Sequence, residues 1–248
     1  MRVLIYEHDN AFAEVLREAL RARSYAVDRV SSSRHAALAL ENDIYDLILF
    51  GIDGDLGSLS ILKEYRSGGS AASVVAFSSQ HSVAERTLAF EAGADACLEK
   101  PVDITELTAR IRALMRRRIG QLRSVVSYGT LTLDDASCSV WADDAPIALK
   151  TREYAILRIF FTEPNRFFSA AYLEEKIYGW GEEVQSNAIQ VHVHSLRKKL
   201  GTQRIETRNG AGYRLVTNSA DVTCRLRTRQ TAAVAEHGEQ GHQERVVS

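Results

Sequence analysis

The sequence predicts an α/β protein of two domains, in which a five-stranded, doubly wound parallel sheet precedes a smaller domain of short strands and helices. The length of 248 residues favours two small domains over one large domain. Before residue 118, short apolar runs alternate with helical patterns, which predicts βαβ units and therefore a parallel sheet. After that point the pattern changes to short strands followed by three helical stretches.

The first domain is predicted to span residues 1–118. Its candidate strands are Val3–Tyr6, Ala26–Val30, Leu47–Phe50, Val74–Phe77 and Ala96–Leu98. Between these runs, apolar residues recur at the three- to four-residue spacing of amphipathic helices. Right-handed crossovers then give a doubly wound sheet, in which functional groups gather at the carboxyl ends of the strands.

The second domain is predicted over residues 127–218, after a charged linker at 119–126. Its candidate strands are Tyr128–Leu133, Ser137–Trp141 and Pro146–Leu149, and its candidate helices are Arg152–Phe161, Ala170–Ile177 and Asn187–Leu200. Thr151, Ser169 and Ser186 are the expected N-caps. A glycine-rich turn joins Arg204–Thr207 to Tyr213–Val216 as a hairpin, which completes a winged helix-turn-helix. Residues 219–248 are polar and are predicted to form a disordered tail.

Composition excludes several classes of protein. No apolar run approaches the roughly 20 residues of a membrane span, so we expect no membrane partner. No targeting segment is recognisable, which indicates a cytoplasmic protein. Three cysteines at irregular spacing favour neither a disulfide framework nor a zinc site. We expect no cofactor and no metal, and the absence of a nucleophile–base pair argues against an enzyme.

The net charge of −1 conceals a basic segment near the end of the second domain. Between Asn187 and Asn218 the charged residues are Arg197, Lys198, Lys199, Arg204, Arg208 and Arg214, against Glu206 alone. Such a segment suits contact with nucleic-acid phosphates, although a solvated helix face is an equal alternative.

The helix predicted over Asn187–Leu200 has two distinct faces. Ile189, Val193, Leu196 and Leu200 form one apolar stripe, which predicts the buried side. The opposite face carries Asn187, Gln190, Val191, His194 and Lys198. Val191 is either an incidental exposed valine or a contact for a thymine methyl group, and the polar side chains suit base edges. Double-stranded DNA is therefore the predicted partner, with Arg208 and Asn209 of the hairpin near the backbone or the minor groove.

The second domain resembles the effector domain of the OmpR/PhoB family of response regulators. The stretch Ser186–Gly201 is similar to the family's recognition helix, Ile205–Leu215 to its wing, and Leu149–Tyr154 to the start of its first helix. The resemblance covers residues 1–217 and implies a DNA-binding transcription regulator of two-component type. It places His192, His194, Ser195 and Arg197 at positions that meet DNA, and Thr207 at a phosphate. The family usually has an arginine where Asn209 stands, and Arg208 is displaced by one position.

The same resemblance implies that the first domain is a flavodoxin-like receiver. Family receivers accept a phosphoryl group from a histidine kinase on an aspartate, beside a magnesium ion held by acidic residues. Here Glu7, Ser78 and Lys100 match the first acid, the switch hydroxyl and the lysine. Gly51 stands at the aspartate position, His8 at the second acid and Cys97 at the aromatic switch residue. We therefore expect a degenerate site that neither binds magnesium nor depends on a cognate kinase.

Two other interpretations of this site remain open. Asp53, with Asp55 nearby, could replace the missing aspartate and give a conventional phosphorelay regulator. The chain could also be an interaction module that forms heterodimers with another regulator. Lys100 is expected either to pair with Glu7 or to fill the old site. His8 and Cys97 suggest pH or redox sensitivity, or simply packed side chains.

Family members dimerise through the fourth helix, the fifth strand and the fifth helix of the receiver. The resemblance makes Arg86, Glu91, Asp95, Arg110 and Arg117 candidates for this interface. A constitutive homodimer would place two winged helices on half-sites about one helical turn apart. The family's contact with RNA polymerase corresponds to Tyr178–Gln185, where Tyr178, Trp180, Glu182 and Glu183 form either that contact or a solvated turn.

Overall fold

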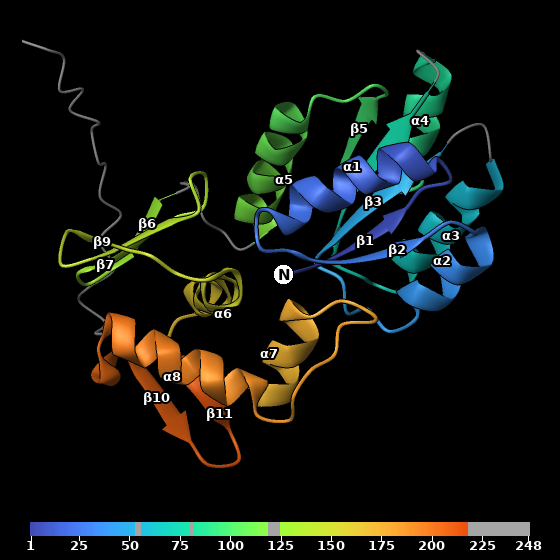
Figure 1. The fold of residues 1–248 in the computed structure, drawn as a ribbon. Coiled ribbons are helices and arrows are strands. Elements are labelled where there is room, and N and C mark those ends of the chain that lie inside the picture. The colour runs from blue at the N-terminus through green and yellow to red at the C-terminus, as the bar shows by residue number, and fades with distance from the viewer. Residues whose placement is uncertain (53–55, 80–81, 119–124, 218–248) are drawn as a thin grey trace, which may run out of the picture.

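The computed structural model describes residues 1–52, 56–79, 82–118 and 125–217. Two domains lie side by side, with the beginning of the chain between them (Figure 1). The N-terminal domain holds a five-stranded parallel sheet, and the C-terminal domain holds a four-stranded sheet, three helices and a two-stranded hairpin. The predicted fold class is therefore confirmed. Asp53, Asp55, most of the predicted linker and the predicted tail lie outside the described residues.

The N-terminal sheet has the order β2-β1-β3-β4-β5, and every pair of neighbouring strands is parallel. The strands are β1 (Arg2–Tyr6), β2 (Ala26–Val30), β3 (Leu47–Gly51), β4 (Ser73–Ser78) and β5 (Ala96–Glu99). Helices α1 (Asn10–Arg21) and α5 (Ile104–Arg118) cover one face, while α2 (Ser33–Leu40), α3 (Leu56–Ser67) and α4 (Val83–Glu91) cover the other (Figure 1). This topology brings Glu7, Gly51, Ser78 and Lys100 to one edge of the sheet, as predicted.

The C-terminal domain begins with an antiparallel sheet that differs from the prediction. Its strands are β6 (Val125–Tyr128), β7 (Leu131–Asp134), β8 (Ser139–Ala142) and β9 (Ala145–Ile147). The single strand predicted over Tyr128–Leu133 is wrong, because a turn separates β6 from β7. Gly129 adopts a φ of 60° in this turn, a left-handed conformation that glycine adopts without steric cost. Strand β6 also begins inside the predicted linker.

Three helices and a hairpin complete the C-terminal domain. They are α6 (Thr151–Thr162), α7 (Ala170–Ile177), α8 (Ala188–Leu200), a short 3-10 helix (Thr202–Arg204), β10 (Ile205–Arg208) and β11 (Gly212–Leu215). The Ser169 hydroxyl caps α7 by accepting from Tyr172 N, as predicted. The caps predicted at Thr151 and Ser186 are wrong: Lys150 and Asn187 occupy the N-cap positions. At α6, the Glu153 carboxylate accepts from Lys150 N at 2.8 Å, so the side chain at N3 satisfies the N–H group of the N-cap residue.

The two domains meet where the N-terminal strands begin. Lys176 of α7 donates to Asp46 Oδ1 at 3.0 Å and to Ile44 O at 2.7 Å. Trp180 N donates to Asp28 Oδ1 at 2.6 Å, and the Arg158 guanidinium lies 4.3 Å from the centre of the Tyr25 ring. Because these polar groups are buried and paired across the boundary, they favour one relative orientation of the domains.

Among the described residues, no helix combines the length and the apolar content needed to cross a bilayer.

Candidate functional site

Helix α8 has the two faces that its sequence predicts. Ile189, Val193, Leu196 and Leu200 are buried in the core of the C-terminal domain. The outward positions are exposed: Asn187, Gln190, Val191, His194 and Lys198. Val191 is 54% exposed, so this apolar side chain is presented to solvent. The helix therefore offers a mixed polar and apolar surface of the kind that reads base edges.

A buried carboxylate lies beneath α8. Glu153 of α6 accepts from the Ser195 hydroxyl at 2.6 Å and from Lys199 Nζ at 2.7 Å. Burial alone raises the pKa of Glu153, but the hydrogen bonds from Lys199 and Ser195 outweigh it and hold the pKa below its ordinary value. Glu153 was not predicted from the sequence, although a glutamate three positions after an N-cap is the signal of a capping box. The network fixes α8 on α6.

Four of the predicted DNA-contacting residues take part in contacts within their own domain. Ser195 bonds Glu153, and His192 Nε2 lies 2.8 Å from the Tyr178 hydroxyl, where burial lowers the pKa of the imidazole. Arg197 donates to Ile205 O at 2.8 Å and to Thr207 Oγ1 at 2.6 Å. The Arg197 contacts tie α8 to the hairpin, and a DNA contact for all four residues stays a prediction.

The hairpin is held against the start of α7. Phe168 and Tyr213 form an antiparallel bridge, and a Cβ atom on Gly212 would lie 2.0 Å from Phe168 O. Gly212 also has a φ of 106°, so this position requires glycine for two reasons. Asn209 is exposed at the tip, whereas the Arg208 guanidinium lies 4.7 Å from the centre of the Phe167 ring. The hairpin thus presents its tip beside α8.

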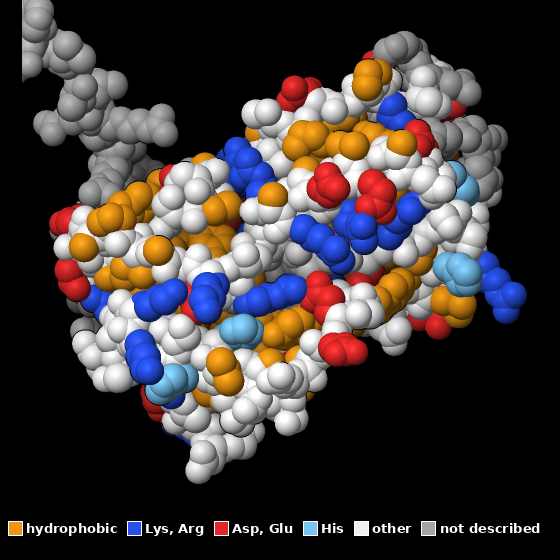
Figure 2. Space-filling model, viewed as in Figure 1, with side chains coloured by type: hydrophobic (Ala, Val, Ile, Leu, Met, Phe, Trp, Pro, Cys, Tyr) orange, Lys and Arg blue, Asp and Glu red, His pale blue; other side chains and the backbone are white. Residues whose placement is uncertain are grey.

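Basic side chains gather on this side of the domain. In Figure 2, Lys and Arg side chains form a row over the region of α6 and α8, with His side chains beside them. The exposed part of α8 contributes Lys198, while Lys199 is held by Glu153. This row of basic side chains lies next to the exposed face of α8. A DNA backbone would lie there if α8 entered the major groove.

At the edge of the N-terminal sheet, Glu7 fills the space next to Gly51. A Cβ atom built on Gly51 would lie 2.8 Å from Glu7 Oε2. The same oxygen lies 2.7 Å from Lys100 Nζ, and Oε1 accepts from Asp9 N at 2.9 Å. Glu7 is fully buried, and Lys100 Nζ also lies 5.0 Å from the centre of the Phe12 ring. The pairing of Lys100 with Glu7, one of two alternatives expected from the sequence, is confirmed.

The other described residues of this edge do not assemble a magnesium site, and Asp53 and Asp55 lie outside the part of the chain that the structure describes. The His8 ring is exposed and contacts the Tyr6 ring edge-on, with centroids 5.1 Å apart. Asp9 accepts from backbone N–H groups of α1, and Glu7 is engaged by Lys100. Among the described residues no group of three or more ligating side chains could hold a metal. The residues present therefore do not fit the hard, oxygen-rich coordination that magnesium needs.

The two switch positions are also engaged. The Ser78 hydroxyl donates to the Glu85 carboxylate of α4. Cys97 is half-buried against the core between the sheet and α2, α3 and α4, and burial raises the pKa of its thiol. A raised thiol pKa disfavours the reactive thiolate, which favours the interpretation of Cys97 as a packed side chain.

The residues predicted for a dimer interface are partly paired within the chain. Arg86 pairs with Glu99, Arg110 with Glu106, and Asp95 with Arg66. Glu91 and Arg117 are exposed. Two apolar side chains of α4 are also exposed, Val83 at 68% and Phe90 at 51%.

Comparison with known proteins matches a segment of each domain to a known family. Residues 3–112 match the family described as "Response regulator receiver domain", and residues 144–215 match "Transcriptional regulatory protein, C terminal". The chain is 36% identical to the transcriptional regulatory protein QseB of Haemophilus influenzae, over 87% of this chain and 98% of that protein. It is 39% identical to the response regulator PmrA of Pseudomonas aeruginosa, over 86% of this chain and 97% of that protein.

A solved structure, the OmpR/PhoB homolog DrrB of Thermotoga maritima, covers 87% of this chain and 98% of its own, with 18% identity and a TM-score of 0.42. The family matches and the relatives of nearly equal length carry the assignment. The chain therefore belongs to the OmpR/PhoB family of response regulators, the DNA-binding transcription regulators of two-component systems.

Proposed function

We propose that this response regulator binds its operator without phosphorylation of the receiver. The observation that carries the proposal is the geometry at Gly51. This residue has no side chain to accept a phosphoryl group, and the Glu7 carboxylate, paired with Lys100, occupies the neighbouring space. The lysine that would neutralise phosphoryl oxygens is thus already neutralised by a carboxylate of the chain. In this proposal the receiver holds the effector domain in one orientation and forms the contacts of the dimer.

The reading surface of the proposed regulator is the outward face of α8. Gln190 and His194 present hydrogen-bonding groups, Val191 presents a methyl-binding surface, and Lys198 reaches toward phosphates. Contact of loop residues 178–185 with RNA polymerase stays a prediction. In the structure, Trp180 N is held by Asp28 of the receiver and Glu182 pairs with Arg152 of α6.

We also propose that the regulator is a homodimer through α4, β5 and α5. The exposed side chains of Val83 and Phe90 add apolar surface to this face, and exposed apolar patches favour association. A dimer that forms without phosphate places two α8 helices on two half-sites. The partner in this dimer is a second copy of the chain. In this proposal the dimer forms without phosphorylation by a kinase.

The test is binding of the purified protein to genomic fragments, with and without acetyl phosphate and magnesium, at a stated salt concentration. We expect specific binding that the phosphodonor leaves unchanged, and a dimer in sedimentation under both conditions. Binding that requires the phosphodonor would show that Asp53 or a neighbour accepts phosphate. A monomer at micromolar concentration would contradict the homodimer.

The assignment of roles on α8 has its own test. Lys198→Gln is expected to reduce the slope of log K against log salt concentration by about 1, because one phosphate contact is lost. Gln190→Ala is expected to weaken specific binding by about 1–3 kcal/mol and to leave nonspecific binding unchanged. Lys63→Gln, an exposed lysine of α3, is the matched control. An unchanged slope for Lys198→Gln would remove this residue from the interface.

A further inference from the structure

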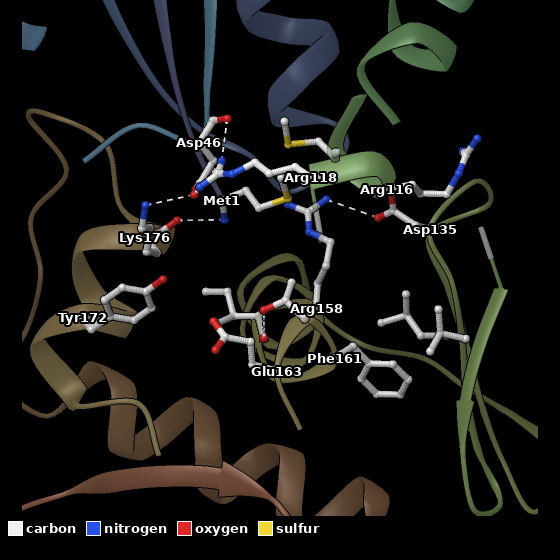
Figure 3. Close-up of a pocket in the computed structure, with 15 residues that line it drawn as sticks. Met1, Asp46, Arg116, Arg118, Asp135, Arg158, Phe161, Glu163, Tyr172 and Lys176 are labelled. Atoms are coloured by element: carbon white, nitrogen blue, oxygen red, sulfur yellow. Dashed lines mark hydrogen bonds and ion pairs between the residues drawn. The ribbon is translucent and has the colours of Figure 1, made fainter. Parts of the chain in front are cut away.

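A cavity of about 150 Å³ lies between the two domains. Its walls come from the end of α5 and the start of β1 and β3 in the receiver, and from β7, α6 and α7 in the effector domain. Figure 3 shows the arrangement: the Arg158 side chain rises from α6 toward Met1 and Asp135, Lys176 points toward Asp46, and Tyr172 and Phe161 lie on opposite sides. The cavity therefore exists only while the domains are docked.

One part of the cavity is apolar. Val126, Leu133, Ile159 and Phe161 of the effector domain and Met115 of the receiver line it. A cavity of about 150 Å³ with apolar walls accommodates a benzene-sized group. The space thus fits one six-membered ring or a short branched chain.

The polar part of the cavity has a surplus of cations. Arg116, Arg118, Arg158 and Lys176 line it, against Asp46, Asp135 and Glu163. Glu163 pairs with Arg166, which lies outside the cavity, so two carboxylates remain against four cations. Burial alone raises the pKa of Asp46, but the Met1 amino group and Lys176 outweigh it and keep the pKa below its ordinary value. Asp46 is therefore an ionised partner for Lys176 and Arg118, and Asp135 is the carboxylate nearest to Arg158.

Arg158 is buried, with only 5% of its surface exposed. One guanidinium nitrogen lies 3.5 Å from Asp135, and two weak hydrogen bonds of 3.4 and 3.3 Å reach the carbonyls of Arg23 and Ser24. Its Nε atom is buried without an acceptor among the residues that the structure describes. A buried donor without an acceptor is costly, and a ligand oxygen at this position would remove the cost.

We propose that this cavity is a binding site for a small monocarboxylate with an aromatic or branched apolar body. The apolar part of the ligand packs against Met115 of the receiver and Phe161 of the effector domain, and its carboxylate accepts from Arg158. Since the ligand touches both domains, binding stabilises the docked arrangement by mass action. Its role as the signal that replaces phosphate depends on the proposed function, whereas binding itself does not.

The test uses benzoate as the probe and isothermal titration calorimetry of the full chain as the readout. We expect saturable binding of one benzoate per chain, and at least tenfold weaker binding of the neutral isostere benzamide. The titration extends to about 10 mM benzoate, because a weaker affinity would be too low for a specific site of this size. Absence of binding up to that concentration would overturn the proposal. So would equal binding of benzamide. Either result leaves the outcome of the phosphodonor experiment unaffected.

Three variants locate the site. Thr162→Trp is expected to abolish binding, because the indole ring takes up the space of the ligand at the end of α6. The Thr162 hydroxyl donates to Ile159 O of its own helix, so the hydrogen bond lost is a local one. Arg158→Met is expected to weaken benzoate binding about tenfold or more. Arg34→Met, an exposed arginine of α2 outside the cavity, is the matched control and should bind benzoate as the parent does. Thermal denaturation confirms that each variant is folded, and full binding by Thr162→Trp would place benzoate elsewhere.

Discussion

Gly212→Ala is expected to destabilise the effector domain by about 3–5 kcal/mol. The new Cβ atom would lie 2.0 Å from Phe168 O, and the φ of 106° is unfavourable for alanine. The hairpin must therefore move away from the start of α7, which breaks the bridge between Phe168 and Tyr213. Urea denaturation followed by tryptophan fluorescence measures the effect, since both tryptophans, Trp141 and Trp180, belong to the effector domain.

The matched control is Gly210→Ala in the same turn. Gly210 also has a positive φ, of 78°, but a Cβ atom there would meet nothing within 4 Å. We expect a cost of about 1 kcal/mol, which is the conformational penalty alone. Equal effects of the two substitutions would mean that the close approach to Phe168 is relieved without breaking the bridge.

Glu7→Gln is expected to destabilise the receiver by about 3 kcal/mol. The substitution leaves the Lys100 ammonium, whose side chain is 13% exposed, beside a neutral amide instead of a carboxylate at 2.7 Å. Far-UV circular dichroism reports the helices of both domains, whereas the two tryptophans lie in the effector domain. The shift of the dichroism transition, compared with that of tryptophan fluorescence, therefore measures the effect on the receiver. Glu14→Gln, in an exposed pair with Arg17, is the control and should change stability by less than about 0.5 kcal/mol.

A double substitution separates the net contribution of the ion pair from the cost of leaving the Lys100 charge buried without a carboxylate. Glu7→Leu with Lys100→Met replaces the buried pair by apolar side chains of similar size. Such replacements are often neutral, so we expect the double variant to be within about 1 kcal/mol of the parent. If Glu7→Gln alone costs less than 0.5 kcal/mol (the range of a surface pair), the ion pair does not stabilise this edge of the receiver.

The fold class was predictable because both domains follow simple periodicities. The receiver strands are short apolar runs, and the buried stripe of α8 repeats every three to four residues. The strand over Tyr128–Leu133 was wrong because Gly129 and Thr130 form a two-residue turn between residues that suit strands on both sides. The cap at Thr151 was wrong because the helix begins at Thr151 itself, after Lys150, whose N–H donates to Glu153. In both places the same local sequence is compatible with two different local structures.

The sites were predictable only in part. The sequence and its resemblance identify Gly51 as the residue at the acceptor position, but the place taken by Glu7 depends on how β1 lies beside β3. The bond between Trp180 and Asp28 joins residues 152 positions apart, and nothing local in either segment indicates it. The interdomain cavity is built from such contacts, and it was therefore not predictable from one sequence.

The contacts of α8 divide its polar residues into two groups with separate consequences. Ser195, Arg197 and Lys199 hold the helix on α6 and the hairpin, whereas Gln190, Val191, His194 and Lys198 extend into solvent. If α8 reads the operator as proposed, a library that randomises only the second group would vary operator preference while the fold is kept. Redesign of the target sequence would then concern four neighbouring surface positions on a helix that is held in place by other residues.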